Sequence, residues 1–189
     1  MPKRRLILMR HAKSDWSDGQ LLDFERPLAA RGKKAAKHMG KWLKHQHYHV
    51  DRIICSPALR TKQTAQCVAD QLGLPHDDMT MDDSLYEASL DALLAMLKKN
   101  HHPAQTLLLI AHNPGLDQLL CYLCREIPPT NHSGKLMTTA AIAVLSYDDN
   151  CSDIFAPRQA RLECLVRPRE SLKDRKSTRL NSSHANVSR

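Results

Sequence analysis

The chain has 189 residues, of which 42% are apolar and 25% are charged, as expected for one compact soluble domain. No stretch approaches the roughly 18 apolar residues of a membrane helix, and Arg10 ends the first apolar run too early for a signal peptide, so we expect a cytoplasmic protein without membrane contact. Most of the net charge of +8 comes from residues 158–189, which carry nine Lys or Arg and three Asp or Glu, and the scarcity of aromatic residues argues against nucleic-acid binding.

The first predicted strand, residues 6–9, is a run of four apolar residues that ends at Arg10 and His11. Such a run is typical of a strand that is buried on both faces of a sheet. In open α/β sheets ligands bind beyond the carboxyl ends of the strands, which is where both side chains lie. A guanidinium binds phosphate oxygens well, and a neutral imidazole can attack phosphorus. The alternative is a histidine that makes only a structural hydrogen bond.

The first predicted helix runs from Leu28 to about Gln46. Its apolar residues share one stripe and its lysines lie outside that stripe, which we interpret as a solvated face. Beyond it, the alternating His45, His47 and His49 would share a face only on a strand. Because this segment connects a helix to a strand and has no acidic cluster, we predict a polar connection and no metal site.

The second predicted strand, Arg52–Cys55, is followed by a helix over residues 57–72. We expect Ser56 to cap this helix and Pro57 to occupy its first position. Arg60 then belongs to the first helical turn, where free N–H groups and the helix dipole already favour an anion.

An acidic stretch over residues 77–88 is predicted to be irregular, and residues 89–99 form a third helix. The next strand begins at Thr106, is again apolar and ends on His112, before a turn that contains Asn113. A second histidine therefore lies at the end of a buried strand.

A fourth helix is predicted over residues 116–125, and strands over residues 139–147 and 161–166 complete the pattern as a pair. Six cysteines do not indicate disulfides in a chain without a secretory signal. Cys121 and Cys124 lie within the fourth helix among leucines, so we interpret them as buried core thiols and not as a redox pair.

Strands that alternate with helices predict an α/β fold, a three-layer sandwich with a mostly parallel central sheet and helices on both faces. We assign this domain to residues 1–170. Residues 171–189 lack an apolar period and resemble translated vector sequence, so we predict a disordered, possibly non-native tail and exclude it from the functional argument.

Three strand ends thus bring Arg10, His11, Arg60 and His112 toward one edge of the sheet. The segments that carry them resemble the histidine phosphatase superfamily, which has the phosphoglycerate mutase-like fold, and most of all its branch of SixA-type phosphohistidine phosphatases. The resemblance covers about residues 4–147 and rests on these motifs: Met9-Arg10-His11, Ser56-Pro57-Ala58-Leu59-Arg60-Thr61, Ala111-His112-Asn113-Pro114-Gly115, Lys13-Ser14-Asp15-Trp16, Arg26-Pro27-Leu28, Arg31-Gly32 and Leu85-Tyr86-Glu87-Ala88. One departure is Ala12, which replaces the usual glycine after the histidine.

The resemblance implies a mechanism in which His11 attacks phosphorus and becomes a phosphohistidine. Arg10, Arg60 and a protonated His112 then hold the phosphoryl oxygens, and neither a metal nor another cofactor is required.

Backbone groups near Lys13 and Ser14 and the turn at Asn113 are expected to add hydrogen-bond donors for the substrate. Glu87 matches the position of a catalytic glutamate in mutase relatives. It is equally well explained as an exposed carboxylate that caps the helix at Ser89.

The substrate is inferred from the shortness of the chain between Arg60 and His112, which leaves 51 residues for several elements and little for a lid. An open groove suits a phosphohistidine on a signalling or phosphotransfer protein, and the labile P–N bond needs little acid catalysis. The alternatives are a phosphatase that hydrolyses small phosphate esters and a non-catalytic phosphate-binding module.

Overall fold

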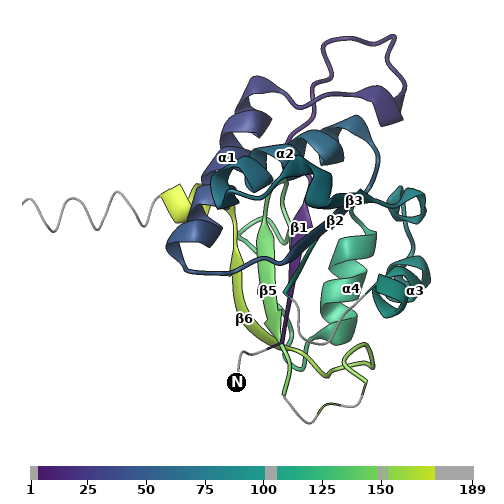
Figure 1. Ribbon diagram of the computed structural model, residues 1–189, viewed down its shortest axis with the longest axis vertical. Helices are drawn as coiled ribbons and strands as arrows, with labels where there is room; N and C mark the ends of the chain where they lie inside the picture. The colour runs from purple at the N-terminus through teal and green to yellow at the C-terminus, as the bar shows by residue number, and fades with distance from the viewer. Residues whose placement is uncertain (1–3, 101–105, 149–150, 152, 173–189) are drawn as a thin grey trace, which may run out of the picture.

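The computed structural model describes residues 4–100, 106–148, 151 and 153–172, and its centre is a twisted six-stranded sheet (Figure 1). The order of the strands across the sheet is β3-β2-β4-β1-β5-β6. Their bounds are β1 Arg5–Arg10, β2 Arg52–Cys55, β3 Met79–Met81, β4 Leu107–Ala111, β5 Ile142–Ser146 and β6 Arg161–Val166.

Four of these strands run parallel, because β1 and β2 both pair in parallel with β4, and β3 pairs in parallel with β2. The last two strands form antiparallel pairs, β5 with β1 and β6 with β5. The register places Arg10 opposite Ala111 and Cys55 opposite Ile110. The carboxyl ends of β1, β2 and β4 therefore meet at one edge of the sheet, where ligands bind in this class of fold.

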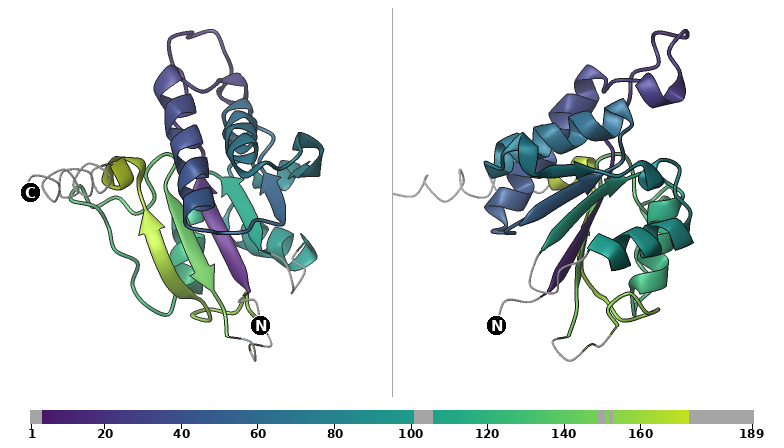
Figure 2. Two further views of the ribbon diagram at one scale, coloured as in Figure 1. Left: turned by 60° about the vertical axis from the view of Figure 1, so that its left-hand side comes forward. Right: turned by 45° about the vertical axis from the view of Figure 1, so that its right-hand side comes forward.

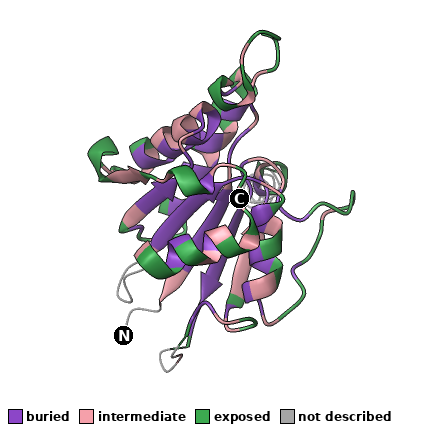
Figure 3. Ribbon diagram, turned by 90° about the vertical axis from the view of Figure 1, so that its right-hand side faces the viewer, coloured by how far each residue is buried: buried purple, intermediate pink, exposed green. Residues whose placement is uncertain are grey.

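Helices cover both faces of the sheet, which confirms the predicted three-layer α/β arrangement (Figure 2). Helices α1 Ala30–His45 and α2 Leu59–Leu72 pack on one face. Helices α3 Leu90–Asn100 and α4 Gly115–Leu123 pack on the other. Alternate residues of β1 point into two different cores, since successive side chains of a strand face opposite sides. Figure 3 shows the sheet buried between helices whose outer faces are exposed.

Short 3₁₀ helices complete the connections: η1 Asp23–Glu25, η2 His76–Asp78 and η3 Asp83–Leu85. The stretch over residues 77–88 is therefore more regular than the sequence predicts, and it also contains β3. This strand has three residues and lies at the edge of the sheet. Three residues are too few for an apolar alternation to be recognised, and this is why the sequence pattern missed the strand.

Two local predictions are wrong. Helix α2 begins at Leu59 and not at Pro57, because Ala58 is its N-cap residue and has a non-helical backbone with ψ 137°. Ser56 consequently does not cap the helix. Cys121 is exposed on α4, whereas Cys124 is buried as expected.

The assignment of residues 1–170 to one domain and of 171–189 to a disordered tail stays a prediction. Residues 173–189 lie outside the described part of the chain. Within it, Ser171 is buried and its hydroxyl lies 3.1 Å from Nε2 of His38 on α1. Among the helices of the described residues, none is long and apolar enough to cross a membrane.

Candidate active site

Arg10 and His11 lie at the carboxyl end of β1, as the sequence predicts. The imidazole of His11 is buried, and the centre of its ring lies 5.1 Å from that of His112, which follows β4. The N–H of His11 donates to the carbonyl of Ala111, so the parallel pairing of β1 with β4 continues to the histidine itself. The sheet therefore brings the two histidines together.

The tautomer of His11 follows from one hydrogen bond. Its Nδ1 lies 2.8 Å from the carbonyl oxygen of Ala12. Because a carbonyl oxygen only accepts, Nδ1 must carry the hydrogen. In the neutral ring Nε2 then keeps its lone pair, which is the form that attacks an electrophile.

The surroundings of His11 also keep its ring neutral. Burial lowers its pKa to about 4, and although the bond to Ala12 opposes the shift, the charges of Arg60 and Arg10 add to it. At neutral pH the ring is therefore an uncharged base. The first requirement for a nucleophilic histidine is met without help from another base.

Arg60 lies in the first turn of α2 and is buried, as predicted. One of its Nη2 hydrogens points toward Nδ1 of His112 at 3.4 Å. Because the guanidinium can only donate, Nδ1 of His112 accepts, and its Nε2 carries the hydrogen in the neutral ring. That Nε2–H donates to the hydroxyl of Ser56 at 2.8 Å, with the hydroxyl of Thr61 at 3.4 Å.

The expected protonation of His112 does not hold in the unliganded site. Burial, together with the nearby His11 and Arg60, lowers its pKa to about 3. The cationic neighbours that were expected to balance phosphate charge therefore oppose a proton on this ring while no anion is present. His112 enters the site as a neutral hydrogen-bonding group.

Arg10 is held in place by the loop that precedes β5. Its Nη1 donates to the carbonyl oxygen of Met137 at 3.0 Å, and Nδ2 of Asn113 donates to the same oxygen at 3.2 Å. The N–H of Met137 in turn donates to the carboxylate of Asp117 at 3.1 Å. Among the described residues, Nε of Arg10 and Oδ1 of Asn113 are buried without a hydrogen-bond partner.

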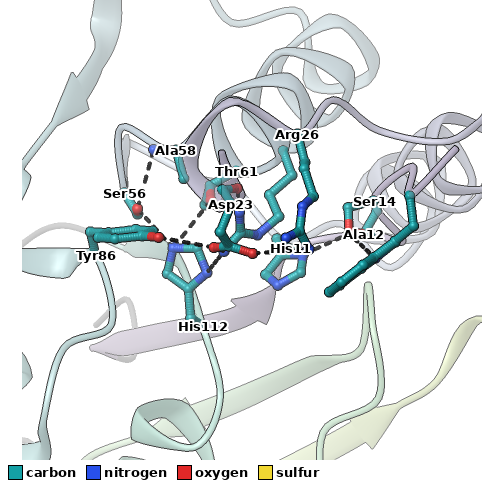
Figure 4. Close-up of polar contacts among 12 residues, drawn as sticks. His11, Ala12, Ser14, Asp23, Arg26, Ser56, Ala58, Thr61, Tyr86 and His112 are labelled. Carbon is teal, nitrogen blue, oxygen red and sulfur yellow. Dashed lines mark hydrogen bonds and ion pairs between the residues drawn. The ribbon is translucent and has the colours of Figure 1, made fainter. Parts of the chain in front are cut away.

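A residue that sequence reasoning missed, Asp23 of η1, lies directly on the predicted phosphate-binding group. Its Oδ2 accepts from Nη2 of Arg60 at 2.8 Å and from the hydroxyl of Tyr86 at 2.9 Å, and its backbone carbonyl accepts from Nη1 of Arg60. Arg26 forms an ion pair with its other oxygen at 3.3 Å. Figure 4 shows Asp23 beside His112, with the hydroxyl of Tyr86 directed at its carboxylate.

Asp23 is ionised in this arrangement. Burial alone would raise its pKa, but the hydrogen bond from Tyr86 and the charges of Arg60 and Arg26 outweigh that effect and lower it. The carboxylate of Asp23 thus takes up hydrogen-bond donors of Arg60, the arginine that is expected to hold a phosphoryl group.

Aromatic rings form a row from the site to the surface. The ring of Tyr86 meets that of His112 edge-on at 5.6 Å, and the ring of Phe24 meets that of Tyr86 at 5.1 Å. Phe24 is 40% exposed. The site is therefore partly covered, and the cover comes mainly from residues 15–27, which precede α1. The open groove was predicted from the shortness of the chain between Arg60 and His112, and these covering residues lie outside that part of the chain.

Lys13, Ser14 and Glu87 make no hydrogen bond or ion pair with the four central side chains among the contacts resolved for the described residues. Glu87 is exposed, has a left-handed backbone with φ 51°, and makes no hydrogen bond or ion pair among the contacts resolved for the described residues. The hydroxyl of Ser14 accepts from Nε1 of Trp16 at 3.0 Å. The carbonyl of Lys13 accepts from the N–H of Ala29, and its side chain is half-buried.

The missed residues had weak signals in the sequence. Tyr86 lies one position before Glu87 in the motif Leu85-Tyr86-Glu87-Ala88. The motif was recognised, but the catalytic role was assigned to Glu87. Asp23 lies three positions before Arg26, and only the fold shows that this loop turns back onto α2. Within the part of the chain that the structure describes, no group of three or more His, Cys, Asp or Glu is placed to hold a metal ion.

Comparison with known proteins agrees with this geometry. A model of the histidine phosphatase superfamily, branch 1, matches residues 6–99. The phosphohistidine phosphatase SixA of Escherichia coli is 31% identical over 159 residues, which are 80% of this chain and 90% of that protein. The solved structure of a protein histidine phosphatase SixA with tungstate is 27% identical and has a TM-score of 0.71, over 87% of this chain and 97% of that one. A mycobacterial glucosyl-3-phosphoglycerate phosphatase, 19% identical with a TM-score of 0.59 over 85% of this chain and 97% of its own, shares the fold.

Proposed function

Because this chain belongs to the histidine phosphatase superfamily, we propose that it is a phosphatase that removes the phosphoryl group from a phosphohistidine of a protein through a covalent intermediate on His11. The observation that carries the proposal is the hydrogen bond from Nδ1 of His11 to Ala12, which leaves a neutral Nε2 beside Arg10, Arg60 and His112. A lone pair that faces two guanidinium groups suits attack on an anionic phosphoryl group.

In the first step, Nε2 of His11 forms a bond to phosphorus while the bond from phosphorus to the leaving group breaks. The leaving nitrogen takes the bonding electron pair and one proton. Arg10, Arg60 and the Nε2–H of His112 stabilise the charge on the equatorial oxygens. His112 turns from Ser56 toward the phosphoryl group or shares its hydrogen with both.

In the second step, a water oxygen attacks phosphorus and the bond to His11 breaks. Inorganic phosphate leaves, the water proton goes to a base or to solvent, and His11 recovers its neutral form. Positioning and fixed charge supply most of the acceleration, since phosphoryl transfer has a loose transition state.

Asp23 is better placed than Glu87 to donate the proton to the leaving group. It already contacts Arg60, whereas Glu87 is exposed. A phosphoryl group that takes over Arg60 brings negative charge next to this carboxylate, which raises its pKa from the lowered value of the free site. With its pKa raised in this way, Asp23 takes up a proton when the substrate binds. It can then donate that proton to the leaving group.

Two considerations support phosphohistidine as the substrate. The P–N bond is labile, so it demands less of the acid than an alkyl ester does. The cover over the site consists of one loop and the Tyr86 segment, and Phe24 and Trp16 on it remain 40% and 63% exposed. A surface of this kind accommodates a protein side chain, whereas a mutase must exclude water from its phosphoenzyme.

The covalent step is tested with a radiolabelled phosphohistidine peptide and the variants His11→Ala and His112→Ala. We expect an acid-labile, base-stable phosphoenzyme in the wild type and none in His11→Ala, whose hydrolysis falls by at least about 1000-fold. Residual hydrolysis equal to that of the parent would contradict the mechanism. Arg4→Ala, a change away from the site, serves as a control for general damage.

The substrate class is tested by comparing kcat/KM for phosphohistidine peptides, aryl phosphates and sugar phosphates. We expect the phosphohistidine peptides to be preferred by at least about tenfold. A strong preference for sugar phosphates would instead assign the chain to the small-molecule phosphatases.

A further inference from the structure

The two segments that meet over the site are strongly acidic, although the protein as a whole is basic. Residues 15–25 and 82–91 each contain four Asp or Glu and no Lys or Arg, whereas the chain carries a net charge of +8. The segments touch through the hydroxyl of Tyr86 and Oδ2 of Asp23 and through the rings of Phe24 and Tyr86. Figure 1 shows the first of them, between β1 and α1, reaching past the ends of the helices.

Most of this charge lies on the surface, where the exposed carboxylates form no ion pair with any of the described residues. We call the exposed carboxylates of the two segments the acidic rim, and they are Asp18, Glu25, Asp83, Glu87 and Asp91. Asp23, by contrast, is paired with Arg60 and Arg26 inside the site. The site therefore has a positive interior, formed by Arg10 and Arg60, and a negative border.

Exposed apolar side chains lie within the first acidic segment. Trp16 is 63% exposed, Leu22 is 70% exposed and Phe24 is 40% exposed. The indole of Trp16 is held in place, because the guanidinium of Arg26 stacks on it at 3.6 Å and its Nε1 donates to Ser14. Fixed aromatic residues within a charged border are typical of surfaces that bind proteins.

We infer that the acidic rim and these apolar side chains form a docking surface for a phosphoprotein in which basic and apolar side chains surround the phosphohistidine. The inference rests on the proposed function and narrows its substrate class. A small phosphate ester brings only negative charge and is repelled by the rim before it reaches the arginines. A protein segment with lysines beside its phosphohistidine is attracted by the rim and delivers one phosphoryl group to the positive interior.

The test uses two short synthetic peptides, each with one phosphohistidine, flanked by lysines in one peptide and by glutamates in the other. We expect the wild type to hydrolyse the lysine peptide with a kcat/KM about tenfold higher than that of the glutamate peptide. This ratio should decrease as ionic strength rises, because salt screens exposed charges over about 10 Å.

The residues are tested with a variant that neutralises the rim, Asp18→Asn/Glu25→Gln/Asp83→Asn. Each change keeps a side-chain oxygen, so the hydrogen bonds that Asp18 and Glu25 accept from nearby backbone N–H groups remain possible. We expect the peptide ratio to fall from about tenfold to about threefold or less. The rate of hydrolysis of an aryl phosphate, which carries no lysines or glutamates beside its phosphoryl group, should stay the same or increase slightly.

A matched control makes the same chemical changes away from the site. In Asp77→Asn/Asp78→Asn/Glu126→Gln, the three carboxylates are also exposed. The first two belong to η2, which precedes the amino end of β3, whereas the site lies at the carboxyl ends of the parallel strands. Glu126 lies beyond the carboxyl end of α4, and it is the amino end of α4 that follows His112. This control has the same net charge as the rim variant and should keep the wild-type ratio.

Equal rates for the two peptides in the wild type would overturn the inference, as would an equal loss of preference in the rim variant and its control. If the enzyme hydrolyses aryl phosphates but neither peptide, the proposed phosphohistidine substrate is itself wrong, and the docking surface falls with it. Preference for the lysine peptide that depends on the rim supports both.

Discussion

The carboxylate of Asp23 lies 2.8 Å from the guanidinium of Arg60, the side chain that we propose to hold a phosphoryl oxygen. Tyr86 holds the same carboxylate oxygen at 2.9 Å. If Arg60 binds the phosphoryl group as proposed, the substrate displaces an internal anion from it, and the displaced carboxylate stays next to the new negative charge. The same contact that weakens phosphate binding also prepares a proton donor.

Asp23→Asn is expected to separate these two effects. Removal of the negative charge should strengthen inhibition by inorganic phosphate about tenfold, because Arg60 no longer carries a charged competitor. Loss of the acid should lower kcat for aryl phosphates by about 100-fold, and for phosphohistidine by less. Inhibition constants and kcat values for both substrates check the prediction. The neighbouring exposed Glu25→Gln should change neither quantity by more than about twofold, and a phosphate affinity in Asp23→Asn equal to that of the wild type would show that the two anions do not compete.

Ser56→Ala tests how the orientation of His112 is maintained. The buried hydroxyl of Ser56 accepts the Nε2–H of His112 at 2.8 Å, and it fixes the rotation of the ring, whose tautomer is set by the hydrogen bond from Arg60 to Nδ1. Its removal should lower kcat/KM by about tenfold and cost about 1 kcal/mol of stability. Steady-state kinetics and urea unfolding measure the two effects separately. If the variant is strongly destabilised in urea unfolding while its kcat/KM is unchanged, Ser56 has only a structural role.

The sequence predicted the parts of the site that lie on regular elements. His11 and His112 follow apolar strands, and parallel pairing of β1 with β4 necessarily brings their ends together. Arg60 follows β2 by a short turn into a helix, so its place was also determined by local pattern. Burial on both faces makes such strands conspicuous as apolar runs.

The parts that could not be predicted depend on loops that fold back over long distances in sequence. Asp23 reaches Arg60 across 37 positions, and Tyr86 reaches Asp23 across 63. Neither residue belongs to a periodic pattern. Glu87 was expected to act because it matches the position of a catalytic glutamate in mutase relatives, but Glu87 is exposed with a left-handed backbone, while Tyr86 faces the site.

The neutral, buried histidines predict how stability changes with pH. The pKa of His112 is about 3 in the folded protein and about 6.5 when unfolded, so between these values only the unfolded chain binds a proton. Stability is therefore lost as pH falls below about 6.5, by about 2 kcal/mol at pH 5 for this residue. His112→Gln should lose about 2 kcal/mol less than the wild type between pH 7 and pH 5. Urea unfolding at the two pH values checks this, and parallel losses in both proteins would mean that His112 is charged in the folded state.

Gly32 of α1 allows the helix to pack against the backbone that follows His11. A Cβ at this position would overlap the carbonyl oxygen of Lys13, two residues after His11, and backbone cannot move aside as a side chain can. We expect Gly32→Ala to destabilise the protein by about 2 to 3 kcal/mol. Because the displaced segment carries Ala12, whose carbonyl fixes the His11 tautomer, kcat/KM should also fall.

Gly40→Ala provides the comparison on the same helix. Its Cβ would lie 3.0 Å from the side chain of Gln71 on α2 and 3.1 Å from the Cα of Val68, so the two helices must separate slightly, but neither contact involves the loop after β1. The higher helix propensity of alanine offsets part of that cost, so we expect a loss of about 1 kcal/mol or less with kcat/KM unchanged. Thermal unfolding and steady-state kinetics on both variants distinguish the two positions. Equal activity losses in Gly32→Ala and Gly40→Ala would mean that general loosening of α1, and not the contact with Lys13, disturbs the site.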